Sequence, residues 1–508
     1  MKRNVKITFK RPYLNSIKRD FILIGVITFL YLSCWALITP PGGSGDDYYH
    51  LPSIWCSDKL ASDKSCILQD GKYYVPSTLA FENVTCWVSW GDRLPNATQQ
   101  SAKCINDYNE TSFGFSTYLN QKNHLYPPLF YNLSSLFVFS NIELSIICIR
   151  LFWALLFAII FSNIFLTINK YKKPHFLFYN LLLLIPLGSY IIPSSNPSSG
   201  AIIGLFALPY YLNFFIFSKD RFKQHLMKLM LVAIIAGFSR ADAAIICVLI
   251  LVVGTLLWKT AVTISKLLPI LSVMFLMCIP FITSIQTRTL IKDGLTSRLH
   301  PNEFVGLNLF AKNFARQFEY YSGFWGYYWG LGWRFEPPIP LVVPLFLAII
   351  FLFYFMILSN TISEKFPKIL ILGFSYLSVL VPILVLTYSN QEVGMVVQPR
   401  YGYPFLLSGL GLMLMNVDIV KVDQLKVKFL SNLSIKISLF VWQIATSFIF
   451  LLQLSRVTNG LPIRYKAQPE WWWSFYAISP NLLFLTFLLI NGLIFRYVIK
   501  IYKESVNS

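Results

Sequence analysis

Long apolar stretches recur along almost the whole of this chain of 508 residues. The first of them, residues 21–39, is long enough to cross a bilayer as a helix that rises about 1.5 Å per residue. Hydrophobic residues make up 55% of the chain and charged residues only 13%, a balance that excludes a soluble domain. The pattern predicts an all-α, polytopic membrane protein with about twelve transmembrane spans.

The apolar stretches divide the chain into six parts. We expect a cytoplasmic basic tail (1–20), a first span (21–39), an extracytoplasmic loop (40–141), a transmembrane region (142–284), a second extracytoplasmic loop that is amphipathic and rich in aromatic residues (285–340), and a C-terminal transmembrane region (341–508). One apolar block, residues 229–258, is too long for a single span. It is interrupted by Ser-Arg-Ala-Asp at residues 239–242, which predicts two short helices that meet there.

The net charge of +20 is distributed unevenly across the membrane. With these spans, 25 of the 43 Lys and Arg residues fall on the side of the termini, but only 6 of the 23 Asp and Glu residues do. This is the positive-inside bias of membrane proteins and not a nucleic-acid-binding surface. We therefore expect a bacterial plasma-membrane protein with both termini in the cytoplasm, in contact with membrane lipids and with no nucleic-acid partner.

A glycine-rich turn follows the first span directly, at residues 40–50, and is called the acidic turn below. Asp46, Asp47 and His50 emerge here at the membrane boundary, where carboxylates are costly to desolvate and are seldom kept for packing. One carboxylate is a candidate general base toward an acceptor hydroxyl group. The other, with His50, is a candidate ligand set for Mg²⁺ or Mn²⁺, and His50 is also a candidate substrate-binding residue. The alternative is a solvated turn in which an Asp caps backbone amides.

Two arginines lie at span ends on the same expected side as the acidic turn. Arg240 lies with Asp242 at the tip of the broken helix pair, and Arg400 is followed by Tyr401 and a span. A guanidinium group can bind phosphate through two parallel hydrogen bonds, so these four residues and Asn196 are candidate substrate-binding residues. The alternatives are a structural Arg–Asp contact at Arg240, an interfacial arginine at Arg400 and a simple turn at Asn196.

Four of the eight cysteines lie in the first extracytoplasmic loop and predict two disulfide bonds, with the pairing left open: Cys56, Cys66, Cys86 and Cys104. A zinc site is the alternative, although the spacing matches no close-paired ligand pattern. Aromatic residues crowd positions 320–334, which predicts either an aromatic belt at the lipid headgroups or a platform for a sugar ring or an isoprenoid chain. Residues 471–473, three tryptophans, read as a belt.

Four motifs occur in a fixed order: Asp-Asp-x-x-His at residues 46–50, Ser-Ser-Asn-Pro-Ser at 194–198, Ser-Arg-Ala-Asp at 239–242 and Gln-Pro-Arg-Tyr at 398–401. In this order they resemble a bacterial family of uncharacterised predicted membrane proteins, which has P-D-E-x-x-H after the first span. Gly45 stands here in the place of the proline, and Asp47 in the place of the glutamate. The layout of that family is similar to that of the GT-C glycosyltransferases, which use polyprenyl-phosphate sugars and place an acidic pair in the first outer loop.

The resemblance implies an integral membrane glycosyltransferase with Asp46 and Asp47 as catalytic residues. It would transfer a sugar from a polyprenyl-phosphate donor to a glycan or other cell-envelope acceptor on the outer face. The sequence contains neither G-x-G-x-x-G nor a P-loop motif, which favours a donor that arrives already activated in the membrane. The alternatives are a transporter or flippase of lipid-linked saccharides, and a non-catalytic membrane protein of envelope assembly.

Overall fold

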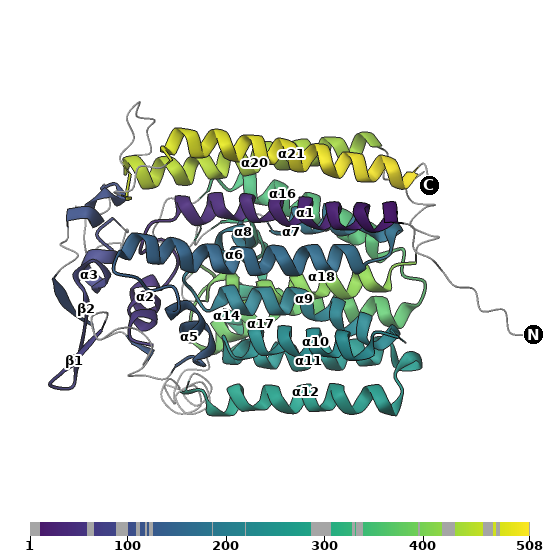
Figure 1. Cartoon of the computed structure of the whole chain (residues 1–508). Coiled ribbons are helices and arrows are strands. Elements are labelled where there is room, and N and C mark those ends of the chain that lie inside the picture. The colour runs from purple at the N-terminus through teal and green to yellow at the C-terminus, as the bar shows by residue number, and fades with distance from the viewer. Residues whose placement is uncertain are drawn as a thin grey trace, which may run out of the picture.

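The protein is an all-α bundle with a small folded loop region at one end (Figure 1). The structure is a computed structural model, and it describes residues 11–57, 66–87, 100–107, 112–116, 119–120, 125–184, 186–218, 220–285, 306–327, 331, 339–394, 397–418, 432–460, 471–473 and 478–506.

Twelve helices of the described residues correspond in order to the twelve expected spans. They are α1 (Arg11–Ile38), α6 (Ile142–Thr167), α7 (Lys173–Leu184), α9 (Ser198–Phe217), α10 (Phe222–Gly237), α11 (Ala241–Leu257), α12 (Ile264–Thr283), α16 (Val342–Ser359), α17 (Lys365–Tyr388), α18 (Tyr403–Asn416), α20 (Asn432–Asn459) and α21 (Pro480–Val506). Eight of these are long and apolar enough to cross a membrane, and the shorter four are α7, α10, α11 and α18.

Two boundaries differ from the sequence expectation for physical reasons. The third span expected from the sequence, about residues 175–192, is interrupted at Pro186. This proline separates α7 from the short helix α8 (Leu187–Ile191), because a proline cannot continue the hydrogen bonding of the preceding turn. Helix α10 begins at Phe222, inside a basic stretch that was expected to lie outside the apolar block. Long Lys and Arg side chains can extend a helix into the headgroup region while their charges stay in water. The predicted break between α10 and α11 is confirmed.

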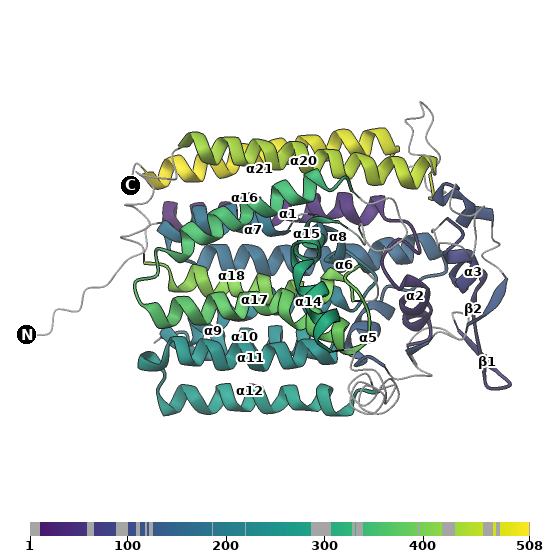
Figure 2. The same cartoon turned by 180° about the vertical axis from the view of Figure 1, so that it is seen from behind.

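The helices lie side by side with nearly parallel axes. Helices α20 and α21 form one edge of the bundle and α12 the opposite edge (Figure 1). Of the apolar window of α9, 83% is buried against other helices, compared with 22% for α12, so α9 is central and α12 is peripheral. Seen from behind, α16 and α17 cover the face that Figure 1 hides, with α14 (Leu307–Ala315) and α15 (Gln317–Ser322) nearby (Figure 2).

A compact loop region covers one end of the bundle, called the loop end below. It contains the helices α2 (Asp47–Trp55), α3 (Phe81–Val84) and α5 (Leu129–Ser135). The strands β1 (Ile67–Gln69), β2 (Lys72–Pro76) and β3 (Phe113–Ser116) form an antiparallel sheet in the order β1-β2-β3, which the sequence did not indicate. Helix α1 begins, and α21 ends, at the opposite end of the bundle (Figure 1).

The four loop cysteines form two disulfide bonds, as predicted. Cys56 is bonded to Cys66, and Cys86 is bonded to Cys104. All four sulfurs are therefore used in bonds to each other, and the zinc alternative is wrong. Each bond closes a short stretch of chain in a region that has only a small sheet and short helices to hold it together, which is where a covalent link stabilises most usefully.

Candidate functional site at the loop end

The acidic turn has an unusual backbone. Gly42 has a φ of 78°, and a Cβ at this position would lie 1.9 Å from the carbonyl oxygen of Val84, so only glycine fits. Asp46, directly before α2, is also left-handed, with φ 64° and ψ 19°, and its side chain makes no helix-capping hydrogen bond. The capping alternative therefore does not describe Asp46. Strained non-glycine residues of this kind concentrate at functional sites, where surrounding contacts hold them in place.

Asp46 is held by an arginine from the last of the four sequence motifs. Arg400 lies in a short 3-10 helix, η8 (Pro399–Tyr401), which enters α18. Its Nη2 donates to the Asp46 carboxylate, and its Nη1 donates to the carbonyl oxygen of Gly45 at 3.3 Å. The Arg400 side chain is 5% exposed and that of Asp46 31% exposed, so the carboxylate is the accessible member of the pair.

Asp47 is held by a second arginine, which the sequence reasoning missed. Arg150 of α6 lies 3.3 Å from Asp47, and both side chains are fully buried. Arg150 also donates to the carbonyl oxygens of Thr39 and Pro40 and to Ser195 Oγ. Burial raises the pKa of the Asp47 carboxyl to about 7, against the opposing effect of Arg150. A lone arginine within the apolar stretch 142–167 was the available signal, since an ionisable residue inside a span is a functional candidate by default.

Arg240 and Asp242 form a bidentate ion pair at the start of α11. Arg240 Nε donates to Asp242 Oδ1 at 2.9 Å, and Nη2 donates to Oδ2 at 2.7 Å. Its third nitrogen, Nη1, donates to Ser198 Oγ at 2.9 Å, which joins this pair to the beginning of α9. Arg240 thus makes the structural contact that was the alternative interpretation, while the Asp242 side chain stays 40% exposed.

Tyr401 and Asn196 connect these pairs into one cluster. The Cζ atoms of Arg240 and Arg400 lie 5.0 Å and 5.4 Å from the centre of the Tyr401 ring, so one aromatic ring is flanked by both guanidinium groups. Asn196 donates from Nδ2 to the Gly45 carbonyl oxygen at 2.7 Å, the same oxygen that Arg400 contacts. Residues that are hundreds of positions apart in the chain therefore meet at the acidic turn.

The comparison with known families identifies one family. The family model described as "Predicted membrane protein (DUF2142)" matches residues 29–408. The chain belongs to this family. The matched DUF2142 region contains the acidic turn, Asn196, Arg240 and Arg400, so it holds every ion pair described above. No curated protein and no solved structure matches the chain.

His50 of the DUF2142 region faces two tyrosines that the sequence reasoning also missed. Its Nδ1 lies 2.9 Å from the hydroxyl of Tyr131, and its ring lies 5.4 Å from that of Tyr126. Burial, together with the positive charges of Arg400 and Arg240, lowers the pKa of His50 well below its usual value, so the imidazole is neutral at pH 7. The two tyrosines are the first and last residues of the loop motif Tyr-Pro-Pro-Leu-Phe-Tyr at residues 126–131, where aromatic residues beside a histidine gave no distinct signal.

The expected Mg²⁺ or Mn²⁺ site does not fit this geometry. Asp46 and Asp47 each face an arginine, and His50 faces Tyr131, so the three side chains do not share one coordination centre. Within the described part of the chain, no group of three His, Cys, Asp or Glu side chains is placed to hold a metal ion. A divalent cation would also meet the positive charge of two arginines at this turn.

Two small cavities are lined in part by Arg400. One has a volume of about 20 Å³, enough for about one water molecule, and is lined by residues that include Ser44, Tyr190, Asn196 and Arg400. The other, of about 10 Å³, is lined by residues that include Arg240, Asp242, Arg400 and Tyr401. Ser44 Oγ and Arg400 Nε are buried and have no hydrogen-bond partner among the described residues. These atoms are available to a polar ligand that enters beside Arg400.

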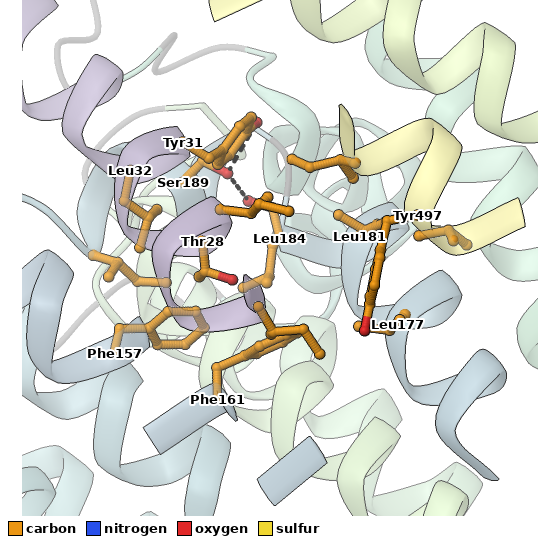
Figure 3. A pocket seen from close by; sticks show the side chains of 15 residues that line it. Thr28, Tyr31, Leu32, Phe157, Phe161, Leu177, Leu181, Leu184, Ser189 and Tyr497 are labelled. Carbon is orange, nitrogen blue, oxygen red and sulfur yellow. Dashed lines mark hydrogen bonds between the residues drawn. The ribbon is translucent and has the colours of Figure 1, made fainter. Parts of the chain in front are cut away.

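A larger, apolar cavity lies deeper in the bundle. It has a volume of about 70 Å³ and is lined by side chains of α1, α6, α7, α8 and α21 (Figure 3). Ser189 donates to the hydroxyl of Tyr31 at 3.5 Å on one wall, and the remaining surface is mainly hydrocarbon. Helix α8 separates this cavity from the acidic turn, since Leu187 and Tyr190 of the same helix line the small cavity beside Arg400.

The aromatic residues expected to form belts are buried instead. Trp325 is fully buried and donates to the carbonyl oxygen of Leu182, and Tyr320 donates to that of Gln398, beside Arg400. Residues 328–330 and 332–334 of this stretch lie outside the described residues. The tryptophans 471–473 are also buried, and the ring of Trp473 contacts those of Trp471 and Trp472 in tilted and edge-to-face arrangements. The belt prediction was wrong for the described members, because packing between loop and bundle was not visible in the sequence.

Proposed function

We propose that the protein is a membrane glycosyltransferase that moves a sugar from a polyprenyl-phosphate donor to a hydroxyl group of a cell-envelope acceptor. One observation carries this proposal. A partly exposed carboxylate, Asp46, lies in direct contact with the buried guanidinium of Arg400, and a second guanidinium, Arg240, lies across the Tyr401 ring. A base for an acceptor and positive charge for a leaving phosphate are thus present together.

The reaction would proceed by direct displacement. Asp46 takes the proton of the acceptor hydroxyl, the acceptor oxygen bonds to the anomeric carbon, and the bond from that carbon to the phosphate oxygen breaks. Polyprenyl phosphate leaves with one more negative charge than the phosphate carried in the donor. The fixed positive charges of Arg400 and Arg240 attract this more negative phosphate more strongly than they attract the phosphate of the donor. They therefore stabilise the transition state, in which this charge develops, and lower the barrier.

Donor binding must first change the partners of Arg400. In the structure its two Nη atoms are occupied by Asp46 and Gly45, and only Nε is without a partner among the described residues. A phosphate that takes over this guanidinium releases the Asp46 carboxylate for proton transfer. The donor would therefore bind before Asp46 becomes an effective base. Without a donor, the carboxylate stays paired with Arg400 and does not activate a water molecule in its place.

The other residues of the cluster hold these groups in place. Asp47 is fully buried against Arg150, so it orients the acidic turn and does not reach an acceptor. Asn196 fixes the Gly45 carbonyl oxygen one residue before Asp46. The neutral His50 and Tyr126, which lie next to each other, offer hydrogen-bonding groups to a sugar hydroxyl.

The proposed location is the outer face of a bacterial plasma membrane, with both termini in the cytoplasm. Two disulfide bonds in the loop region are typical of an oxidising compartment, which supports a loop end on the outer side. The excess of Lys and Arg toward the opposite end supports the same orientation. No nucleotide is needed at this face when the donor is already activated on a lipid.

The test is a transfer assay with purified protein in liposomes and a radiolabelled polyprenyl-phosphate sugar. We expect the wild type to release polyprenyl phosphate in the presence of an envelope acceptor, and Asp46→Asn to lower kcat by about 10²- to 10⁴-fold. Asp107→Asn is the matched control, because Asp107 is an exposed carboxylate of the same loop region. Equal turnover by wild type and Asp46→Asn would refute the proposal.

The same assay separates the alternative functions. A transporter or flippase would move the labelled lipid between leaflets without releasing polyprenyl phosphate. A non-catalytic assembly protein would do neither, at any protein concentration. Release of polyprenyl phosphate together with labelled acceptor is the result that only the transferase gives.

A further inference from the structure

A buried arginine of α20 reaches into the loop region from beyond the DUF2142 match. Arg456 lies in the last turn of α20, and the match ends at residue 408. The residue is 2% exposed, although it carries a charge that burial disfavours strongly unless it is compensated. Its place at the loop end, far along the chain from the matched motifs, calls for a specific role.

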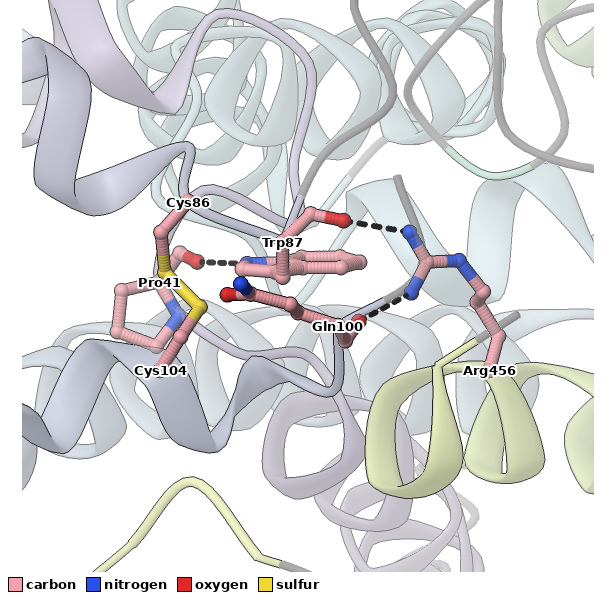
Figure 4. The surroundings of a disulfide bond; sticks show 6 residues. All are labelled: Pro41, Cys86, Trp87, Gln100, Cys104 and Arg456. Atoms are coloured by element: carbon pink, nitrogen blue, oxygen red, sulfur yellow. Dashed lines mark hydrogen bonds between the residues drawn. A yellow bond between two sulfur atoms is a disulfide. The ribbon is translucent and has the colours of Figure 1, made fainter. Parts of the chain in front are cut away.

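Arg456 contacts the loop region at Trp87 and at Gln100. Its Nη1 donates to the carbonyl oxygen of Gln100 at 3.1 Å, and its Nη2 donates to that of Trp87 (Figure 4). The guanidinium also lies over the Trp87 ring, with Cζ 5.2 Å from the ring centre. The disulfide bond between Cys86 and Cys104 closes the same piece of chain, directly beside Trp87.

Trp87 in turn contacts the acidic turn. Its indole Nε1 donates to the carbonyl oxygen of Pro41 at 3.0 Å (Figure 4). The next residue, Gly42, lies so close to the Val84 carbonyl oxygen that no residue with a Cβ atom fits at this position. The contacts of Arg456 with Trp87, and of Trp87 with Pro41, therefore lead to the backbone five residues before Asp46.

We infer that Arg456 is a positioning residue for the acidic turn and acts through Trp87. This inference rests on the proposed transfer reaction, in which Asp46 is the base. Arg456 holds two backbone carbonyls of the disulfide-closed segment, and that segment holds the turn in its strained conformation. The left-handed backbone of Asp46 persists only while its surroundings determine it, so loosening Trp87 lets the carboxylate leave its place beside Arg400.

The first measurement does not depend on any activity. Ser44, two residues before Asp46, is buried, and its hydroxyl has no partner among the described residues. In a background where the four free cysteines are replaced by alanine, Ser44→Cys reports opening of the turn through its rate of labelling by a membrane-impermeant maleimide. These free cysteines are Cys34, Cys148, Cys247 and Cys278. We expect Arg456→Ala to raise this labelling rate at least about tenfold, because it removes the partner of the buried Trp87 carbonyl and the contact with the Gln100 carbonyl.

The second measurement uses the transfer assay with the native Ser44. We expect Arg456→Ala to lower kcat at least about tenfold with little change in the KM for the donor, because the phosphate-binding arginines stay in place. Arg456→Lys should restore part of the lost kcat, since one ammonium can still donate to one of the two carbonyls. Arg496→Ala is the matched control, because Arg496 is an exposed arginine of α21.

The two measurements separate this inference from the proposed function. An unchanged labelling rate in Arg456→Ala, with normal protein levels, overturns the inference whatever the enzyme does. Faster labelling with unchanged kcat also overturns it, because the turn would then be held for stability and not for transfer. If Arg456→Ala is labelled faster but the wild type releases no polyprenyl phosphate, the proposed function is overturned, and with it the role of Arg456 in transfer.

Discussion

Asp47 gives the protein a dependence on pH whose sign can be worked out. The carboxyl is fully buried, and burial raises its pKa from 3.8 to about 7 despite the nearby Arg150. Between about pH 4 and pH 7 the folded state keeps the proton and the unfolded chain loses it. Stability therefore falls as the pH rises through this window, by about 4 kcal/mol in all, at about 1.36 kcal/mol for each pH unit.

Asp47→Asn isolates this contribution, because the amide has nearly the same shape and no charge. We expect the free energy of unfolding of this variant, relative to that of the wild type, to rise by up to about 4 kcal/mol between pH 4 and pH 7. Chemical denaturation in detergent micelles, at half-unit steps of pH, measures this difference. Asp107→Asn, at an exposed carboxylate of the loop region, serves as the control.

The result also decides between two opposing effects at Asp47. Burial favours the neutral carboxyl, whereas the Arg150 guanidinium 3.3 Å away favours the carboxylate. If the wild type instead becomes more stable than Asp47→Asn as the pH rises, the arginine dominates and the reasoning from burial is refuted. A difference that does not change with pH would refute it equally.

Three further changes test the framework around the site. Gly42→Ala should cost at least about 2 kcal/mol of stability, because it adds a steric clash to a left-handed backbone, whereas Gly71→Ala, with a similar φ and no neighbour within 4 Å, should cost clearly less in thermal unfolding. Replacing Cys86 and Cys104 by serine should cost about 2–5 kcal/mol in the same measurement. Arg150→Met should cost about 3–5 kcal/mol by leaving the buried Asp47 carboxyl without its positively charged partner, and adding Asp47→Asn should recover part of that loss.

The arrangement of spans could be predicted from sequence because hydropathy is a local property. The composition of each apolar stretch is enough to indicate a membrane span. The break at residues 239–242 was visible as a charged tetrapeptide within a block too long for one span. The predicted helix boundaries were wrong where local signals conflict. Pro186 divides the third expected span, and basic residues extend α10 beyond its apolar part.

The candidate site was predicted only in outline. Arg400 and Asp46 meet as the order and sidedness of their motifs suggested, but which carboxylate pairs with which arginine depends on packing between helices. Arg150 was overlooked because a single arginine hardly alters the hydropathy of an apolar stretch of 26 residues. Arg456 and Trp87 lie in segments with no motif, and their contact joins positions 369 residues apart. Such pairings follow from the fold and carry no signature in one sequence.

The most direct test of the account is an experimental structure of the protein with polyprenyl phosphate bound. We expect the phosphate group beside Arg400 and within reach of Arg240, with the Asp46 carboxylate released from Arg400 and facing an open path to the acceptor. A phosphate bound elsewhere, with the Asp46–Arg400 pair unchanged, would contradict the account.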